Sequence, residues 1–307
     1  MDTNARVYVA GATTLIGGAL VRTLAARGSF AMIGDPDPAF DDPASVDRFF
    51  ARTRPDYVFV AAGRTAGIAG NERAPADLMI DNLLVAGHLV PAAWRHGVSK
   101  LLYLASSCVY PRLAPQPLQV SSLWTGALEP TSAAYATAKL AGITLCEAFR
   151  LQHGARFIPA IGADVYGPGD DFTPDNAHVV GALIRRIHDA HAALRPSVDV
   201  WGSGEPRREF IYVDDLADAC AFVMREYEGK EPINLGTGVV SSIAELAEEI
   251  CRIVGYGGQL RFDRRRLDGM PFKGLDTTPL RALGWTPRWD LRRGLTKTYE
   301  WFRASLA

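Results

Sequence analysis

The sequence lacks an excess of charge of either sign. It contains 33 Lys and Arg residues against 34 Asp and Glu residues, for a net charge of −1. Proteins that bind nucleic acid or anionic membranes usually carry a basic surface, so this balance supports neither partner. The sequence also has no hydrophobic run long enough to cross a bilayer and no signal-peptide pattern. We therefore expect a cytoplasmic protein with no nucleic-acid or membrane partner.

Cysteine is scarce, with four residues in 307. Cys108, Cys146, Cys220 and Cys251 are scattered, and no two of them have the spacing typical of a metal site. Three of them, at 146, 220 and 251, lie in apolar helical patterns and are predicted to be packed thiols of a reduced protein. We expect no metal. Cys108 differs because it follows the end of a predicted strand.

Apolar runs alternate with helical patterns along most of the chain. This order predicts an α/β fold, a Rossmann-like doubly wound parallel sheet with a smaller mixed α/β substrate domain. We expect the nucleotide domain to comprise residues 1–164 plus about 209–236, and the substrate domain about 165–208 plus 237–307. Strands are predicted at 6–10, 29–34, 56–62, 101–105, 156–161 and 233–235, and helices at about 19–27, 44–53, 71–96, 133–151, 179–191, 214–226 and 242–254.

A glycine-rich turn, Gly11-Ala-Thr-Thr-Leu-Ile-Gly17, joins the first strand to the first helix. Strand, glycine turn and helix together are typical of a dinucleotide site, because glycines let the backbone and the helix N-terminus approach a pyrophosphate. Thr14 takes the place of a middle glycine. Its side chain could crowd the pyrophosphate, or its hydroxyl could replace a backbone contact.

Two carboxylates, Asp35 and Asp37, follow the second strand. An acidic residue there accepts from the ribose 2′-OH of NAD, whereas it would repel the 2′-phosphate of NADP. The pair therefore favours NAD(H). In a second interpretation, the two residues only shape a proline-rich turn.

The central segment places Ser106 at the end of a strand and Tyr135 and Lys139 on one face of the following helix. An ammonium beside a phenol lowers the pKa of the phenol, which makes Tyr135 a usable proton donor. Ligands of open α/β sheets bind at the carboxyl ends of the strands, where Ser106 is expected.

Four sequence motifs extend this pattern along the chain. They are Ser106-Ser-Cys-Val-Tyr-Pro111, Tyr166-Gly-Pro-Gly-Asp-Asp-Phe172, Asn176-Ala-His178 and Asn234-Leu-Gly-Thr-Gly238. With them the sequence resembles the extended short-chain dehydrogenase/reductase superfamily, and more closely the GDP-L-fucose synthase family of 3,5-epimerase/4-reductases. The resemblance spans most of the chain. It departs at Thr13 and Asp35, where this family places Arg, at Phe272, and at Asp164, where it has Asn.

The resemblance implies roles for individual residues. Ser106, Tyr135 and Lys139 would reduce the sugar C4 carbonyl, and Cys108 and His178 would exchange protons at C3 and C5, either one being the base. Cofactor contacts would come from Gly11, Thr13, Thr14, Leu15, Ile16, Gly17, Asp35, Asp42, Ala62, Gly63, Tyr135, Lys139, Asp164 and His178, and substrate contacts from Ser107, Arg186, Trp201, Arg208 and Lys273.

The implied activity is 3,5-epimerisation and NAD(P)H-dependent 4-reduction of a GDP-4-keto-6-deoxyhexose, in a homodimer. Because the departures cluster near the cofactor, one alternative is an epimerase of a related GDP-sugar without net redox chemistry and with weakened or altered cofactor binding. A non-catalytic nucleotide-sugar-binding protein is a third possibility, which the intact set of five catalytic residues disfavours.

Overall fold

The larger part of the molecule is built on a six-stranded, all-parallel sheet. The structure is a computed structural model that describes residues 1–28, 30–174 and 176–306. The strand order of the sheet is β2-β1-β3-β4-β5-β9. Successive strands are added on one side of β1 for β2 and on the other side for β3 and those after it. The strands are β1 (Arg6–Ala10), β2 (Ala31–Met32), β3 (Tyr57–Val60), β4 (Lys100–Ser106), β5 (Phe157–Gly162) and β9 (Ile233–Leu235).

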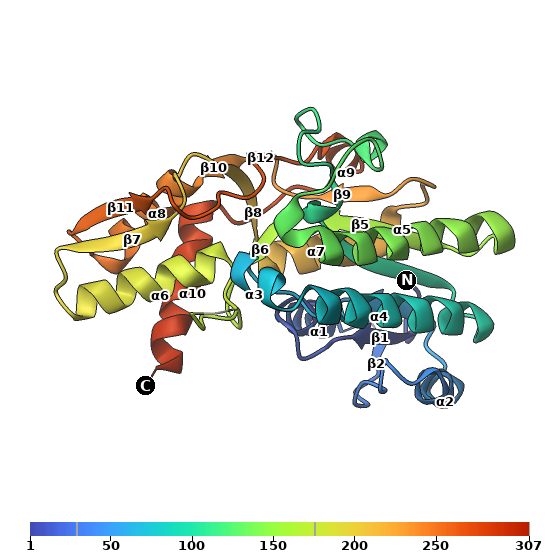
Figure 1. Ribbon diagram of the computed structural model, residues 1–307. Coiled ribbons are helices and arrows are strands. Elements are labelled where there is room, and N and C mark those ends of the chain that lie inside the picture. Colours follow the sequence, from blue (N-terminus) through green and yellow to red (C-terminus); the bar gives the residue numbers. More distant parts are fainter. Residues whose placement is uncertain (29, 175, 307) are drawn as a thin grey trace.

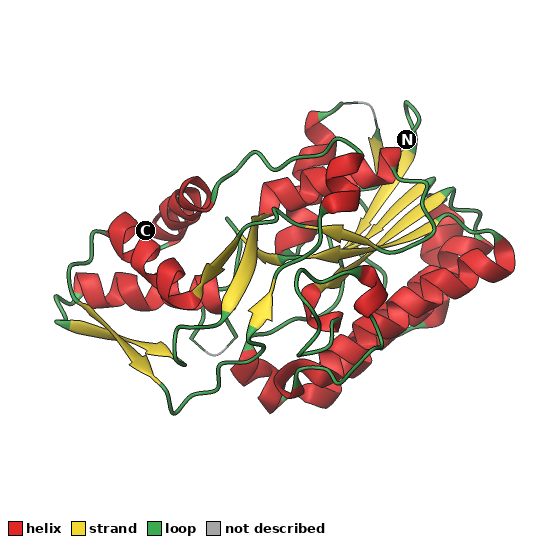
Figure 2. Ribbon diagram, turned by 90° about the horizontal axis from the view of Figure 1, so that it is seen from above, coloured by secondary structure: helices red, strands yellow, loops and turns green. Residues whose placement is uncertain are grey.

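Helices cover both faces of this sheet (Figures 1 and 2). Helices α1 (Leu15–Ala26) and α7 (Val213–Glu226) pack together, as do α4 (Pro75–Arg95) and α5 (Ala133–His153), with α2 (Pro43–Thr53) beside α4. Strands β3, β4 and β5 are buried along nearly their whole length because helices shield both faces. The predicted doubly wound fold is confirmed.

A smaller part forms a second apolar core around shorter strands. Strand β8 (Arg207–Tyr212) pairs with β6 (Asp164–Tyr166), β10 (Val240–Ser242) and β12 (Phe272–Lys273), while β7 (Ser197–Trp201) pairs with β11 (Gln259–Asp263). Helices α6 (Val179–Ala192), α8 (Ile243–Val254) and α10 (Leu291–Ser305) pack around them. The remaining helices are α3 (Ile68–Arg73), α9 (Thr278–Ala282) and the 3-10 turns η1 (Ser107–Val109), η2 (Val120–Ser122) and η3 (Pro130–Ser132).

Three predicted boundaries were wrong. Helix α1 begins at Leu15 rather than Ala19, because the Thr14 side chain caps it by accepting from the Gly17 N–H. The helix predicted at 71–96 is two helices, since Pro75 opens α4 at its first position. Residues 209–212 lie in the smaller sheet, so the chain returns to the main sheet only with α7 and β9.

Two expected segments include residues outside the described part of the chain, namely Ser29 in the predicted second strand and Asp175 in the loop before His178. Within the described part, no helix combines the length and the apolar character needed to span a bilayer.

Candidate active site

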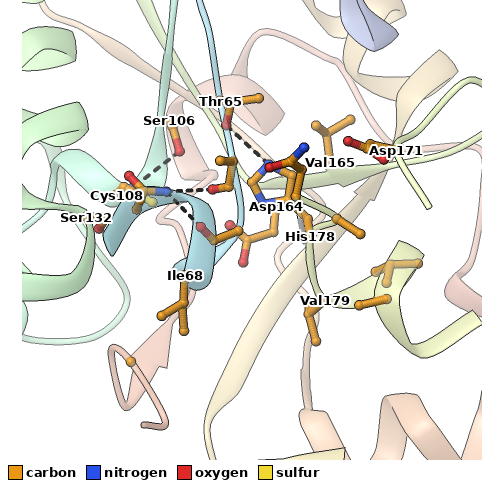
Figure 3. Close-up of a pocket in the computed structure, with 18 of the residues that line it drawn as sticks. Thr65, Ile68, Ser106, Cys108, Ser132, Asp164, Val165, Asp171, His178 and Val179 are labelled. Carbon is orange, nitrogen blue, oxygen red and sulfur yellow. Dashed lines mark hydrogen bonds between the residues drawn. The ribbon is translucent and has the colours of Figure 1, made fainter. Parts of the chain in front are cut away.

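A cavity of about 810 Å³ opens where the carboxyl ends of the parallel strands face the smaller sheet. This is the edge at which open α/β sheets bind ligands. Of the residues predicted as site residues, the cavity is lined by Thr13, Thr14, Leu15, Ile16, Ala62, Gly63, Ser106, Cys108, Tyr135, Lys139, Asp164, His178, Arg186, Trp201, Arg208 and Lys273. Figure 3 shows side chains from both parts of the molecule pointing into it.

The glycine turn is tightly constrained. A Cβ atom on Gly17 would lie 1.9 Å from the Gly11 carbonyl oxygen, and Gly11 has a φ of +83° beside the backbone of Ala62. Thr14 directs its hydroxyl into the turn, where it donates to the Gly11 carbonyl at 2.8 Å and accepts from the Gly17 N–H at 3.1 Å. The Thr14 hydroxyl therefore bonds to the turn itself, and the residues present fit a dinucleotide at the start of α1.

Lys139 is a buried residue of the cavity lining. Its ammonium donates to the Leu104 carbonyl at 3.3 Å and lies 5.9 Å from the centre of the Tyr135 ring. Burial lowers the pKa of Lys139 to about 8. Gly63 makes room for this side chain, because a Cβ there would lie 2.3 Å from Asn82 Oδ1 and 3.4 Å from Lys139 Nζ.

The expected lowering of the Tyr135 pKa is wrong for this structure. Burial raises the pKa of Tyr135, while hydrogen bonds from Thr65 and Ser106 act in the opposite direction. Burial dominates because the phenol lies inside the protein, 9% exposed.

Cys108 lies in the turn η1, next to a partly buried ion pair. Lys273 Nζ is 2.6 Å from an Asp164 carboxylate oxygen and 3.8 Å from Cys108 Sγ. Arg208 Nε lies 3.8 Å from the other oxygen of Asp164, and Ser107 donates to that carboxylate at 3.2 Å. Burial by itself raises the pKa of Asp164, but Lys273 and Arg208 outweigh it and lower the pKa below its usual value.

This arrangement follows from strand register. Lys273 on β12 lies opposite Arg208 on β8, and Asp164 on β6 lies opposite Phe210, two residues further along β8. One short sheet therefore brings three charged side chains together beneath Cys108.

His178 lies at the N-cap position of α6. Its Nε2 atom is 3.2 Å from the Thr65 hydroxyl (Figure 3). Burial lowers the pKa of His178, and the nearby Asp164 carboxylate acts in the opposite direction. Cys108, His178 and Tyr135 therefore reach one cavity from three different elements.

Trp201 forms the outer wall with two arginines. The guanidinium carbons of Arg186 and Arg266 lie 4.1 and 4.7 Å from the centre of its ring. Trp201 is 42% exposed, and the two guanidinium groups over its ring leave part of the indole open to a ligand.

Other predicted site residues lie outside the cavity lining. Gly11 and Gly17 form the turn behind it, Ser107 is buried against Asp164, Asp42 caps α2, and Asp35 accepts from Arg52 at 2.9 Å. Sequence analysis did not assign Thr65 a contact with His178. The position of Thr65 after the carboxyl end of β3, the edge where such sheets bind ligands, is the sequence feature that could have indicated a place in the site.

Known proteins match this chain over most of its length. A model of the NAD dependent epimerase/dehydratase family matches residues 7–236. GDP-L-fucose synthase 1 of Arabidopsis thaliana is 45% identical over 303 residues, which covers 98% of this chain and 94% of that protein. GDP-L-fucose synthase of Escherichia coli strain K12 is 43% identical over 308 residues, covering 97% and 96%.

Solved structures show the same fold over the full length. A GDP-6-OMe-4-keto-L-xylo-heptose reductase from Campylobacter jejuni matches with a TM-score of 0.92 at 30% identity, covering 99% of both chains. A GDP-mannoheptose C4 reductase from the same organism, solved with NADP bound, matches with a TM-score of 0.88 at 31% identity and the same coverage.

The chain is therefore an enzyme of the extended short-chain dehydrogenase/reductase type, and its cofactor is a nicotinamide dinucleotide. Within that superfamily, the length and identity of the matches show that the chain belongs to the GDP-L-fucose synthase family.

Proposed function

We propose that this protein carries out 3,5-epimerisation and 4-reduction of a GDP-4-keto-6-deoxyhexose. The observation that carries the proposal is the convergence of Cys108, His178 and Tyr135 on one cavity beside a dinucleotide turn. A thiol and an imidazole are suited to proton exchange near neutral pH, and a phenol beside a Ser hydroxyl is suited to protonating a carbonyl oxygen. Relatives named GDP-L-fucose synthase support this choice of substrate class.

Epimerisation requires a base on one face of the sugar and an acid on the other. The C4 carbonyl acidifies the protons at C3 and C5, so a side chain can remove each of them. We assign Cys108 as the base because the Lys273 ammonium donates to its sulfur at 3.8 Å and is positioned beside the atom that would take the proton. His178 then returns a proton to the opposite face; burial lowers its pKa, and the Asp164 carboxylate acts in the opposite direction.

Reduction uses the residues at the end of β4 and on α5. A bound reduced nicotinamide supplies the hydride that C4 receives. Tyr135 donates its proton to O4, and the Ser106 hydroxyl, on the same cavity wall, orients the carbonyl. Lys139 lies under the Tyr135 ring, and its ammonium donates a hydrogen bond to the Leu104 carbonyl.

The substrate diphosphate needs cationic partners. Arg186 and Arg208 line the cavity on the side of the smaller sheet, and the partly exposed Trp201, which packs against Arg186, can contact the base. Lys273 is paired with Asp164, close to the part of the cavity where the sugar would react. It therefore contributes to that part of the site as well as balancing the Asp164 charge.

For the cofactor we propose a preference for NADH over NADPH, determined by Asp37. Its carboxylate accepts from the Gly11 N–H at 2.9 Å and from the Tyr8 hydroxyl at 2.6 Å, so it is held at the glycine turn. The adenosine ribose binds beside this turn in dinucleotide folds, and a carboxylate there accepts from the 2′-OH and repels a 2′-phosphate. Asp35 instead pairs with Arg52.

Titration of the protein with each cofactor tests this preference. We expect NADH to bind more tightly than NADPH, and Asp37→Ser to weaken NADH binding while improving NADPH binding. Asp35→Ser is the matched control and should leave the ratio unchanged. Tighter binding of NADPH by the unmodified protein would refute the assignment.

The activity itself is tested by incubating the protein with GDP-4-keto-6-deoxy-D-mannose and reduced cofactor. We expect cofactor oxidation and a product whose NMR spectrum shows inversion at C3 and C5. Inversion without cofactor oxidation would instead indicate the redox-free epimerase. No conversion of any kind would refute both.

We also propose a homodimer formed through α4 and α5, in a cytoplasmic setting. These two long helices lie side by side on one face of the sheet and expose Ile80, Trp94 and Leu151 at 53%, 41% and 91%. Light scattering should give twice the chain mass. A monomer at micromolar concentration would contradict the proposal.

A further inference from the structure

Three consecutive arginines follow the end of β11. Arg264 donates to the Glu205 carboxylate at 2.8 Å, and Arg265 donates to both oxygens of Asp263 at 2.8 and 3.1 Å. Arg266, the third, lines the cavity and makes no ion pair with any residue that the structure describes. Its positive charge therefore faces the cavity without a paired carboxylate.

The backbone holds Arg266 beside Trp201. Asp263, the last residue of β11, lies opposite Trp201, the last residue of β7. The Arg266 N–H donates to the Asp263 carbonyl at 3.1 Å, which turns the chain back towards Trp201. Asp268 then fastens the returning loop, because its carboxylate accepts from the Ser203 N–H at 2.7 Å. The position of Arg266 over the indole, 4.7 Å from the ring centre, thus follows from this turn.

Arg186 reaches the same indole ring from α6. Its guanidinium carbon lies 4.1 Å from the centre of the Trp201 ring, and it too has no ion-pair partner in the described part of the chain. Burial lowers the pKa of Arg186, the charge of Arg266 lowers it further, and Asp199 acts in the opposite direction. Two like charges therefore meet at one ring, which is unfavourable in the absence of an anion.

A diphosphate is the part of a nucleotide sugar that would offset this repulsion. Guanidinium groups donate in pairs to phosphate oxygens, and two neighbouring phosphates can accept from two arginines at once. A neutral base or sugar would leave the repulsion in place. Arg208, another arginine of the cavity, lies 3.8 Å from the Asp164 carboxylate, so its charge is already partly balanced.

We propose that Arg266 is a further substrate-binding residue, which closes with Arg186 on the diphosphate of the nucleotide sugar beside Trp201. The loop that follows β11 then contributes directly to substrate affinity. The inference rests on the proposed function, because it takes the ligand to be a nucleoside diphosphate sugar.

The test uses GDP as the probe and measures its binding by calorimetry, which requires no turnover. Arg266→Gln removes the charge and, because the Arg266 side chain is exposed, little packing. Arg264→Gln is the matched control, since it removes the same charge two residues away from a side chain that pairs with Glu205. Arg266→Lys keeps the charge and loses the planar group. Each protein is titrated at low and at high salt, about 0.05 and 0.5 M.

We expect Arg266→Gln to weaken GDP binding by roughly ten- to hundredfold at low salt, the range for a lost hydrogen bond to a charged group. The loss should shrink at high salt, because ions screen an exposed charge. Arg266→Lys should recover part of the affinity. Arg264→Gln should stay within about twofold of the unmodified protein, as expected for an exposed ion pair.

Unchanged GDP binding in Arg266→Gln, or a loss no larger than that in Arg264→Gln, would overturn the inference. A loss of equal size at both salt concentrations would also overturn it, because it would indicate a contact with the base or a structural role. Failure of the unmodified protein to bind GDP would instead refute the proposed substrate class, and it would be seen before any variant is compared.

Discussion

The assignment of Cys108 as the base depends on individual side chains. Lys273 lies close to its sulfur and is held there by Asp164. In D2O, Cys108→Ala should abolish exchange of the C3 and C5 protons. His178→Asn should keep exchange but lose inversion, because the base can still remove a proton and return a deuteron to the same face. Mass spectrometry and NMR of recovered substrate measure both effects, and the reverse pattern would make His178 the base.

Lys139 contributes a pH dependence of stability with a definite sign. Burial lowers its pKa from 10.5 to about 8, so below pH 8 the folded protein bears the cost of a buried charge. Between about pH 8 and 10.5 the unfolded chain binds more protons than the folded one, so this contribution makes stability rise with pH. The shift corresponds to roughly 3 kcal/mol at most.

We therefore expect Lys139→Met to raise the free energy of unfolding at pH 7 by up to about 3 kcal/mol while removing activity. The gain over the unmodified protein should shrink towards pH 10. Urea denaturation of both proteins at the two pH values measures it. A gain that is constant with pH would mean that Lys139 is not a buried charge in the folded state.

The site residues that could be predicted from the sequence were those that belong to motifs with a fixed spacing. Ser106, Cys108, Tyr135, Lys139 and His178 do reach one cavity. Their environments were not predictable, since the depth of burial that raises the pKa of Tyr135 depends on packing between distant segments. The Thr65–His178 contact likewise joins residues 113 positions apart.

At the scale of elements, the turn between β1 and α1 determines how closely a dinucleotide can approach. Gly17 and Gly18 are adjacent in the sequence but differ in the room that each leaves for a side chain. A Cβ on Gly17 would lie 1.9 Å from the Gly11 carbonyl oxygen, whereas one on Gly18 would lie 3.5 Å from its nearest neighbour, the Ala12 carbonyl oxygen.

Gly17→Ala should therefore destabilise the protein by about 1–3 kcal/mol and weaken cofactor binding, because the turn must open to accept the methyl group. Gly18→Ala should leave both nearly unchanged and serves as the control. Thermal unfolding and cofactor titration measure the two effects. Equal tolerance of both substitutions would show that the turn is looser than described.

Strand and helix positions followed from apolar runs and were largely predictable. Their ends depended on single capping contacts, such as Thr14 at the start of α1. Strand β8 was assigned to the wrong sheet because a buried run of residues does not reveal its pairing partner.

At the scale of the whole molecule, the active site exists only because two parts meet. The main sheet supplies the glycine turn, Ser106 and Tyr135, and the smaller part supplies Asp164, Arg208 and Lys273. The alternation of strands and helices predicted the first part. The short strands of the smaller part carry too weak a sequence pattern for their pairing to be predicted. The charged residues that this part contributes to the site were predicted.

The measurement that tests the central claim most directly is the fate of hydrogen in one turnover. The protein is incubated in D2O with GDP-4-keto-6-deoxy-D-mannose and reduced cofactor, and the product is analysed by mass spectrometry and NMR. The account predicts solvent deuterium at C3 and C5, cofactor-derived hydrogen at C4 and inversion at both exchanged carbons. Reduction at C4 without deuterium at C3 and C5 would contradict it, because Cys108 and His178 would then have no role in the reaction.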